Sequence, residues 1–148
     1  MSAACFVDTN LLVYARDASE PAKQPRAWAW LEVLWQRRCG RLSWQVLQEF
    51  YVVVTQRLRP GMPVAAARED VETLLAWRPV GMDDEVLRLG WAVQDRFGFS
   101  FWDALIVAAA QRARCRYLLT EDLQHGQRLP GGLTVVDPFR TAPAELLA

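Results

Sequence analysis

Residues 3–10 have the sequence Ala-Ala-Cys-Phe-Val-Asp-Thr-Asn, in which a short apolar run ends in three polar side chains. The apolar part predicts a buried strand that stops at Asp8. Two later segments, residues 117–120 and 133–136, have the same character and are also followed by acidic residues. They predict two further buried strands.

Between these strands the apolar residues recur at helical spacing, with Ser43 and Asp83 placed to cap two of the helices. Short strands alternating with helices predict an α/β domain with a mainly parallel sheet. Residues 41–43 and 79–82 are too short to distinguish a strand from a loop. We expect a surface loop at residues 126–132 and a loose tail over the last ten residues. The expected helices cover residues 11–15, 21–38, 44–58, 63–77, 83–97 and 101–114.

The chain has 148 residues and is 52% hydrophobic, which argues against a disordered chain. This length fits one domain over residues 1–148, with a core of about residues 3–139. Its 17 basic and 17 acidic residues cancel. Any binding of nucleic acid must therefore come from a local basic patch.

The chain contains three widely spaced cysteines and one histidine, His125. This set does not support a disulfide framework or a zinc site, and it favours free thiols in a reducing compartment. No apolar run approaches the roughly 20 residues that span a bilayer, and the first residues lack the basic start of a signal peptide. We therefore expect a cytoplasmic protein without membrane association.

Four acidic residues stand out by position. Asp8 and Asp122 follow predicted strands, so they share the carboxyl edge of the sheet if those strands are neighbours. Glu49 has valines at three of its helical neighbour positions, which predicts a carboxylate that is not fully solvated. The alternative is a residue at the rim of the buried face or one paired with an arginine. Asp103 precedes seven apolar residues, so its helix should be deeply buried and begin near the sheet edge.

Together, Asp8, Glu49, Asp103 and Asp122 predict one acidic crevice. Two carboxylates about 5 Å apart repel by roughly 3 kcal/mol at an effective dielectric constant near 20, so the group needs protonation or a cation. Because no histidine or cysteine is placed to help, oxygen ligands favour Mg²⁺ or Mn²⁺. Thr9 and Asn10 are placed to orient Asp8 or to hold a water on the ion.

Four segments resemble the PIN-domain family, and more narrowly the VapC-type ribonuclease toxins of bacterial toxin–antitoxin pairs. They are the strand ending in Asp8-Thr9-Asn10, then Gln45-Val-Leu-Gln-Glu49-Phe-Tyr, then Ser100-Phe-Trp-Asp103-Ala-Leu-Ile, then Leu119-Thr-Glu-Asp122-Leu-Gln-His-Gly126. The resemblance covers residues 3–139. It implies an α/β/α sandwich and a Mg²⁺- or Mn²⁺-dependent endoribonuclease that hydrolyses RNA phosphodiesters. It also implies a cognate antitoxin and a tendency to form homodimers.

Carried over residue by residue, the family's acidic quartet falls on Asp8, Glu49, Asp103 and Asp122, and its polar residue after the first acid falls on Thr9. At the fourth position either Glu121 or Asp122 can face the metal, and the match to the family favours Asp122. All four acids are present, so the sequence gives no sign of an inactive nuclease.

Other residues are candidates for contact with substrate. Arg16 follows the first motif, and Trp102 adjoins Asp103. Trp28 and Trp35 share a helical stripe with an apolar residue, which favours packing in the core or a dimer. Two arginine clusters, residues 37–41 and 112–116, fit either phosphate binding or the charge preference of helix ends.

Two alternatives to the nuclease remain. One is a binding module whose site is vestigial and which acts only through a protein partner. The other is a phosphoryl-transfer protein, but a phosphatase of that kind would need a second aspartate where Asn10 stands. A receiver domain would need a lysine at a strand end, whereas the only lysine, Lys23, lies between two prolines.

Overall fold

The computed structural model describes residues 2–147, and its centre is a five-stranded sheet with the order β2-β1-β3-β5-β4. Neighbouring strands are parallel, except that β4 runs antiparallel to β5. This confirms the predicted mainly parallel sheet. The strands are β1 (Cys5–Val7), β2 (Gly40–Arg41), β3 (Tyr117–Leu119), β4 (Arg128–Leu129) and β5 (Leu133–Val136).

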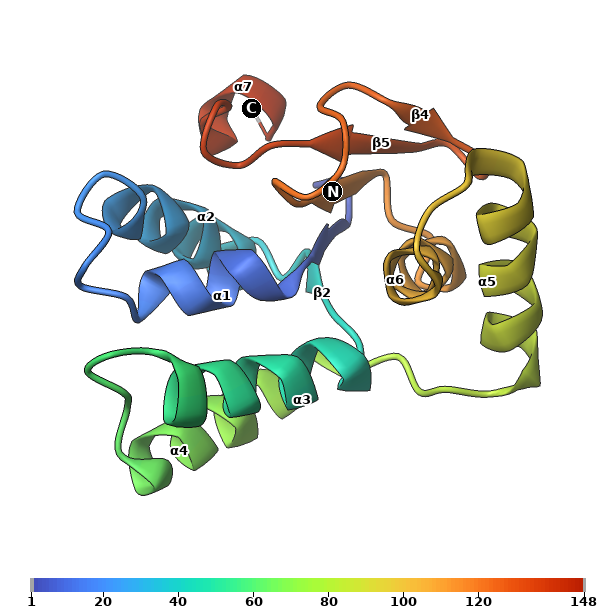
Figure 1. The fold of residues 1–148 in the computed structure, drawn as a ribbon. Coiled ribbons are helices and arrows are strands. Elements are labelled where there is room, and N and C mark those ends of the chain that lie inside the picture. Colours follow the sequence, from blue (N-terminus) through green and yellow to red (C-terminus); the bar gives the residue numbers. More distant parts are fainter. Residues whose placement is uncertain (1, 148) are drawn as a thin grey trace.

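Helices cover both faces of this sheet, which confirms the expected α/β/α sandwich. Figure 1 shows α1, α2 and α7 on one side, α5 and α6 on the other, and the α3–α4 pair beyond the β2 edge. The helices are α1 (Thr9–Ala15), α2 (Gln24–Gln36), α3 (Trp44–Val52), α4 (Val64–Leu74), α5 (Asp84–Phe97), α6 (Phe101–Arg112) and α7 (Pro143–Leu146).

Side-chain caps fix where several helices begin. The Ser43 hydroxyl accepts from the backbone N–H of Val46 at the start of α3, and the Asp83 carboxylate accepts from that of Val86 at the start of α5. Both caps were predicted, and both satisfy a backbone donor that the first helical turn leaves unpaired. Asp8 caps α1 in the same region of the chain where the first strand ends.

Three helices are shorter than the sequence pattern predicts. The α2 helix begins at Gln24 rather than residue 21, with a proline in its first turn. The α3 helix passes at Val53–Arg57 into a π-helical turn, and α4 passes at Leu75–Trp77 into a 3₁₀ turn. These changes of helix type keep the apolar periodicity, so the sequence does not reveal them.

Two expected irregular segments are ordered. The expected loop at 126–132 contains β4, which pairs with β5. The expected loose tail contains α7 and the buried Leu147. The fully buried Trp30 holds this segment, because its indole N–H donates to the carbonyls of Pro138, at 2.9 Å, and Thr141, at 3.0 Å. A contact between residues so far apart in sequence has no local signature.

The core lies between the sheet and the helices, and α6 is its most buried helix. All seven apolar residues from Ala104 to Ala110 are buried, as predicted. The three cysteines, at positions 5, 39 and 115, are buried free thiols. The longest helix of residues 2–147 has 14 residues, and none of the helices in that range qualifies as a membrane span.

Candidate active site

The sheet topology brings two of the four predicted acids to one edge. Strands β1 and β3 are parallel neighbours, and their last residues, Val7 and Leu119, are paired in register. Asp8 follows β1 directly, and Thr120 and Asp122 follow β3. Because the carboxyl ends of parallel strands meet at the same edge, these side chains lie together beyond the sheet.

Asp8 is the most buried of the four acids, with 6% of its surface exposed. Its Oδ1 accepts from the backbone N–H of Thr9, at 2.7 Å, and its Oδ2 accepts from the Thr120 hydroxyl, at 2.8 Å. Burial raises the pKa of the Asp8 carboxyl to about 7, against the opposing effect of these two hydrogen bonds. The charges of Asp122 and Glu49 raise the pKa further.

Thr120, which is fully buried, connects Asp8 to Asp122. Its hydroxyl accepts from the Asn10 amide, at 3.2 Å, and from the backbone N–H of Asp122, at 3.1 Å. The Asn10 amide also donates to Oδ2 of Asp122, at 3.2 Å. The Asp122 side chain reaches solvent, but its surroundings remove part of its hydration and so raise the pKa of its carboxyl. The hydrogen bond from Asn10 lowers this pKa.

Glu49 joins the same group from α3. Its Oε2 accepts from the Thr9 hydroxyl, at 3.0 Å, and its Oε1 accepts from the Gln45 amide, at 3.1 Å. The Glu49 side chain is exposed, which agrees with the rim position that the sequence left open as an alternative. The buried face of α3 runs through Val46, Leu47 and Phe50, and Glu49 extends from the rim of that face towards Thr9.

Asp103 comes from the first turn of α6, where it is half-buried. This end of α6 lies against α3, because the Gln45 amide donates to the Trp102 carbonyl, at 3.3 Å. The negative charges of Asp103, Glu121 and Glu49 all raise the pKa of Asp122. Four elements distant in sequence thus direct carboxylates to one edge of the sheet.

Glu121 has a separate set of partners. Its carboxylate accepts from the Tyr14 hydroxyl, at 2.8 Å, and forms an ion pair with Lys23, also at 2.8 Å. Of the two adjacent acids, Asp122 therefore faces Asn10, while Glu121 is bound to Tyr14 and Lys23.

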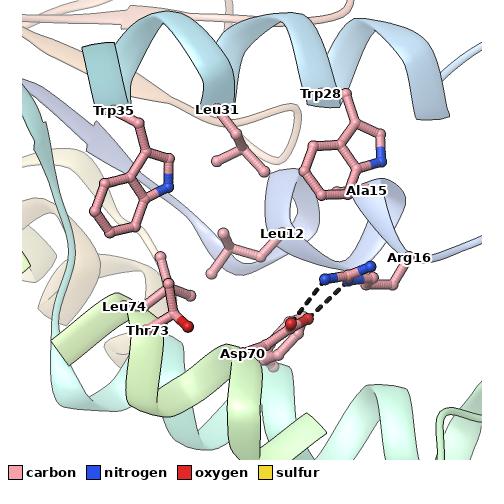
Figure 2. A pocket seen from close by; sticks show the side chains of 10 residues that line it. Leu12, Ala15, Arg16, Trp28, Leu31, Trp35, Asp70, Thr73 and Leu74 are labelled. Atoms are coloured by element: carbon pink, nitrogen blue, oxygen red, sulfur yellow. Dashed lines mark hydrogen bonds and ion pairs between the residues drawn. The ribbon is translucent and has the colours of Figure 1, made fainter. Parts of the chain in front are cut away.

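The structure does not bring Arg16 to the acids. Its guanidinium forms a two-pronged ion pair with Asp70, with both nitrogen–oxygen distances 2.7 Å, and lies over the Trp28 indole. Figure 2 shows this pair at one end of a mostly apolar hollow between α1, α2 and α4, with Trp28 and Trp35 on the α2 side. Trp102, in contrast, is 63% exposed beside Asp103.

Three residues of this region were not among the predicted site residues: Thr120, Gln45 and Arg57. Thr120 was visible only as the polar end of a strand. Gln45 lies one helical turn before Glu49, a spacing that brings two side chains together on a helix. Arg57 lines a hollow of about 400 Å³ together with Thr9 and Glu49, and it reaches that place from the π-helical turn, which has no sequence signature.

The chemistry of the donor set fits a hard divalent cation. All four acids offer oxygen, and Oδ1 of Asn10 is buried within their network without a hydrogen-bond partner among residues 2–147. As arranged, no three histidine, cysteine or acidic side chains of residues 2–147 surround a single point closely enough to coordinate an ion. Donors from Thr9, Asn10, Gln45 and Thr120 lie between the carboxylates, so binding an ion requires side-chain rotation at the exposed acids.

The family model for the PIN domain matches residues 5–128, which include all four acids. The chain belongs to the PIN-domain family. This confirms the resemblance drawn from the sequence. Among curated proteins, none matches the chain.

Solved structures share the fold of this PIN domain at low sequence identity. A toxin–antitoxin complex from Klebsiella pneumoniae is 19% identical, with a TM-score of 0.61 over 91% of this chain and 98% of the other. FitAB bound to an IR36 DNA fragment is 22% identical, with a TM-score of 0.67 over 91% and 95%. VapBC2 from Rickettsia felis, bound to a promoter DNA fragment, is 17% identical, with a TM-score of 0.57 over 90% and 99%.

Proposed function

We propose that this PIN domain is a Mg²⁺- or Mn²⁺-dependent endoribonuclease and the toxin of a toxin–antitoxin pair. One observation carries the proposal: Asp8 and Asp122 are joined through Thr120 and Asn10 at the carboxyl edge of the sheet, with Glu49 bound to the adjacent Thr9. Asp103 is close enough for its charge to act on Asp122. Such a group of carboxylates is typical of sites that hold a hard cation.

The four acids Asp8, Glu49, Asp103 and Asp122 would hold the cation. A divalent ion bound there would act as a Lewis acid and would lower the pKa of a coordinated water, which would favour hydrolysis of a phosphodiester. Thr9 orients Asp8 through its backbone N–H and Glu49 through its hydroxyl. The unpaired Oδ1 of Asn10 is available to accept from a water in the site.

Two residues near the acids are suited to positioning RNA. Arg57 lines the hollow beside Thr9 and Glu49, where its guanidinium can neutralise a phosphate of the substrate. Trp102 offers an exposed indole beside Asp103, on which a base can stack. RNA would then lie across the acidic edge between α3 and α6.

The proposal extends to partners and location. One of the similar structures is a toxin–antitoxin complex, which supports a cognate antitoxin as a partner of this chain. Trp44 and Met82 are exposed large apolar side chains that line one hollow, which supports a surface for a second copy of this chain. The free thiols of the three cysteines fit the reducing cytoplasm, where its RNA substrate is found.

The test is cleavage of single-stranded RNA by the purified chain in Mg²⁺ or Mn²⁺. We expect cleavage that EDTA abolishes and that Asp8→Asn lowers by more than about 100-fold, beyond the 10- to 100-fold typical of residues that only support a metal ligand. Asp95→Asn, which removes an exposed acid from α5, is the matched control and should cleave normally.

The outcomes separate the proposal from its alternative. Equal cleavage by the Asp8→Asn protein, free of contaminating nuclease, would contradict the assigned role. Absence of any cleavage, together with tight binding of a co-expressed antitoxin, would instead favour a vestigial site in a protein-binding module.

A further inference from the structure

The amino end of the sheet, opposite the acids, is rich in arginine. Arg38 precedes β2, and Arg114 and Arg116 precede β3. Arg41 is the last residue of β2, but its guanidinium reaches back to the carbonyls of Arg38 and Gly40. Arg78 follows the 3₁₀ turn after α4 and lines the same hollow as Arg38 and Arg41. A chain with no net charge therefore carries its acids and a cluster of arginines at opposite ends of one sheet.

Three of these arginines, Arg38, Arg41 and Arg78, line one hollow of about 640 Å³, which we call the arginine groove. Trp77 and Gly40 also line the groove. They are in such close contact that a Cβ at Gly40 would lie 2.5 Å from the Trp77 ring. Trp35 also lines the groove and packs against Trp77, with ring centroids 5.1 Å apart. The Trp35 side chain is 37% exposed.

The charges of the arginine groove are not neutralised within the part of the chain that the structure describes. None of the ion pairs among residues 2–147 involves Arg38, Arg41 or Arg78, and no carboxylate lines the groove. Within residues 2–147, the hydrogen bonds of the Arg41 guanidinium are to the carbonyls of Arg38 and Gly40. By contrast, the nearby Arg112 pairs with Asp83 and Glu85.

The backbone at this edge also favours glycine over arginine. Arg38, Arg78 and Arg114 have φ values of 54°, 52° and 56°, and they are the non-glycine residues of positive φ in residues 2–147. Glycine is the usual residue in this conformation after a helix. The partial negative charge of helix ends accounts for a basic residue nearby. It does not account for a hollow that is lined by both Arg38 and Arg78 together with the indole of Trp35.

We propose that the arginine groove binds the phosphates of single-stranded RNA, with a base stacked on Trp35, and so holds the substrate away from the cleavage site. The inference rests on the proposed function for the identity of the ligand. Guanidinium groups match phosphate, and exposed indoles stack on unpaired bases. Because the acidic edge repels RNA and the net charge is zero, attraction to RNA must come from a local basic surface.

The test measures RNA binding without cleavage. All variants are made in the Asp8→Asn background, and the anisotropy of an end-labelled single-stranded oligoribonucleotide is measured over a range of salt concentrations. The test variant is Arg38→Gly combined with Arg78→Gly, because glycine relieves the positive φ and should preserve folding, checked by thermal unfolding. The control, Arg26→Gln with Arg128→Gln, removes the same charge from exposed sites outside the groove.

Loss of two phosphate contacts should reduce the slope of log affinity against log salt by about 1.4, since each contact to a single strand contributes about 0.7. This corresponds to roughly 25-fold weaker binding at 0.1 M salt if the affinities converge at 1 M. The control pair should keep the original slope, and Arg38→Lys with Arg78→Lys should keep most of it.

An unchanged slope in the glycine variant would overturn the proposal. So would a result in which an acidic peptide, but not RNA, binds in a groove-dependent manner, because that outcome assigns the surface to a protein partner. Groove-dependent RNA binding by a chain whose wild type cleaves no RNA would support the arginine groove while contradicting the proposed function.

Discussion

The two ends of the sheet differ in how their charges are held. At the carboxyl end, Asp8 and Asp122 are fixed by short-range hydrogen bonds to Thr9, Thr120 and Asn10, and burial shifts the pKa of both acids. At the amino end, the guanidinium groups of the arginine groove lack carboxylate partners among residues 2–147. Catalysis requires carboxylates held in a fixed geometry. Binding a flexible polyanion such as RNA requires positive charges that are not neutralised by the protein's own carboxylates.

Steady-state kinetics should separate the two ends most strongly. Asp8→Asn should lower kcat by about 10³-fold with little change in KM, because it removes charge needed in the transition state. The Arg38→Gly and Arg78→Gly double variant should instead act mainly on KM, because it removes binding that is equal in ground and transition states. Cleavage of a fluorogenic single-stranded RNA gives both constants. A large loss of kcat in the double variant would remove the distinction.

The pH dependence of stability tests how Asp8 is held. Its folded pKa of about 7 exceeds its usual 3.8, so the folded protein keeps a proton that the unfolded chain loses. The free energy of unfolding of EDTA-treated protein should therefore fall by about 2–4 kcal/mol as the pH rises from about 4 to 7, and then level off. Asp8→Asn should lack this fall and be the more stable protein at pH 8. Urea unfolding at pH 5 and pH 8 measures both, and parallel profiles would contradict the assignment.

Thr120→Val tests the link between Asp8 and Asp122. The change keeps the shape of a fully buried side chain but leaves Oδ2 of Asp8 without its donor, which should cost about 1–3 kcal/mol of unfolding free energy and 10- to 100-fold in cleavage. Thr134→Val in β5 is the matched control, and it should change neither quantity much. Equal behaviour of the two variants would show that Thr120 does not organise the acids.

The smallest effect is expected for Arg16, which belongs to neither end. Arg16→Gln breaks the partly exposed pair with Asp70 and should cost less than about 1 kcal/mol of stability. Because the guanidinium is bound to Asp70 and Trp28, cleavage should stay within about 2-fold of wild type. A rise in KM as large as that of the arginine groove variant would assign Arg16 to substrate binding after all.

The sequence predicted the parts of the site that depend on strand order. Asp8 and Asp122 each end an apolar segment, and parallel neighbours necessarily share an edge. The sequence left the burial of Glu49 open, because helical spacing shows which residues are close but not where the buried face ends. Arg57 was missed, because a π-helical turn reorients the residues after α3 without changing their apolar pattern.

Contacts between distant segments account for the remaining differences in the fold. The C-terminal segment is ordered because the indole N–H of Trp30 reaches two of its carbonyls. The short strand β4 forms because β5 offers it an edge. The arginine cluster at 37–41 was visible in the sequence, but only the fold shows that Arg38 and Arg41 line one hollow together with Arg78.

Calorimetric titration of Mn²⁺ into the wild-type chain and into Asp8→Asn, both freed of metal with EDTA, tests the central claim most directly. The four-carboxylate site predicts uptake by the wild type, at an affinity that rises with pH towards and above 7, as the Asp8 carboxyl loses its proton. It predicts at least about 10-fold weaker binding by the variant. Absence of Mn²⁺ binding by the wild type, or equal binding by both proteins, would contradict it.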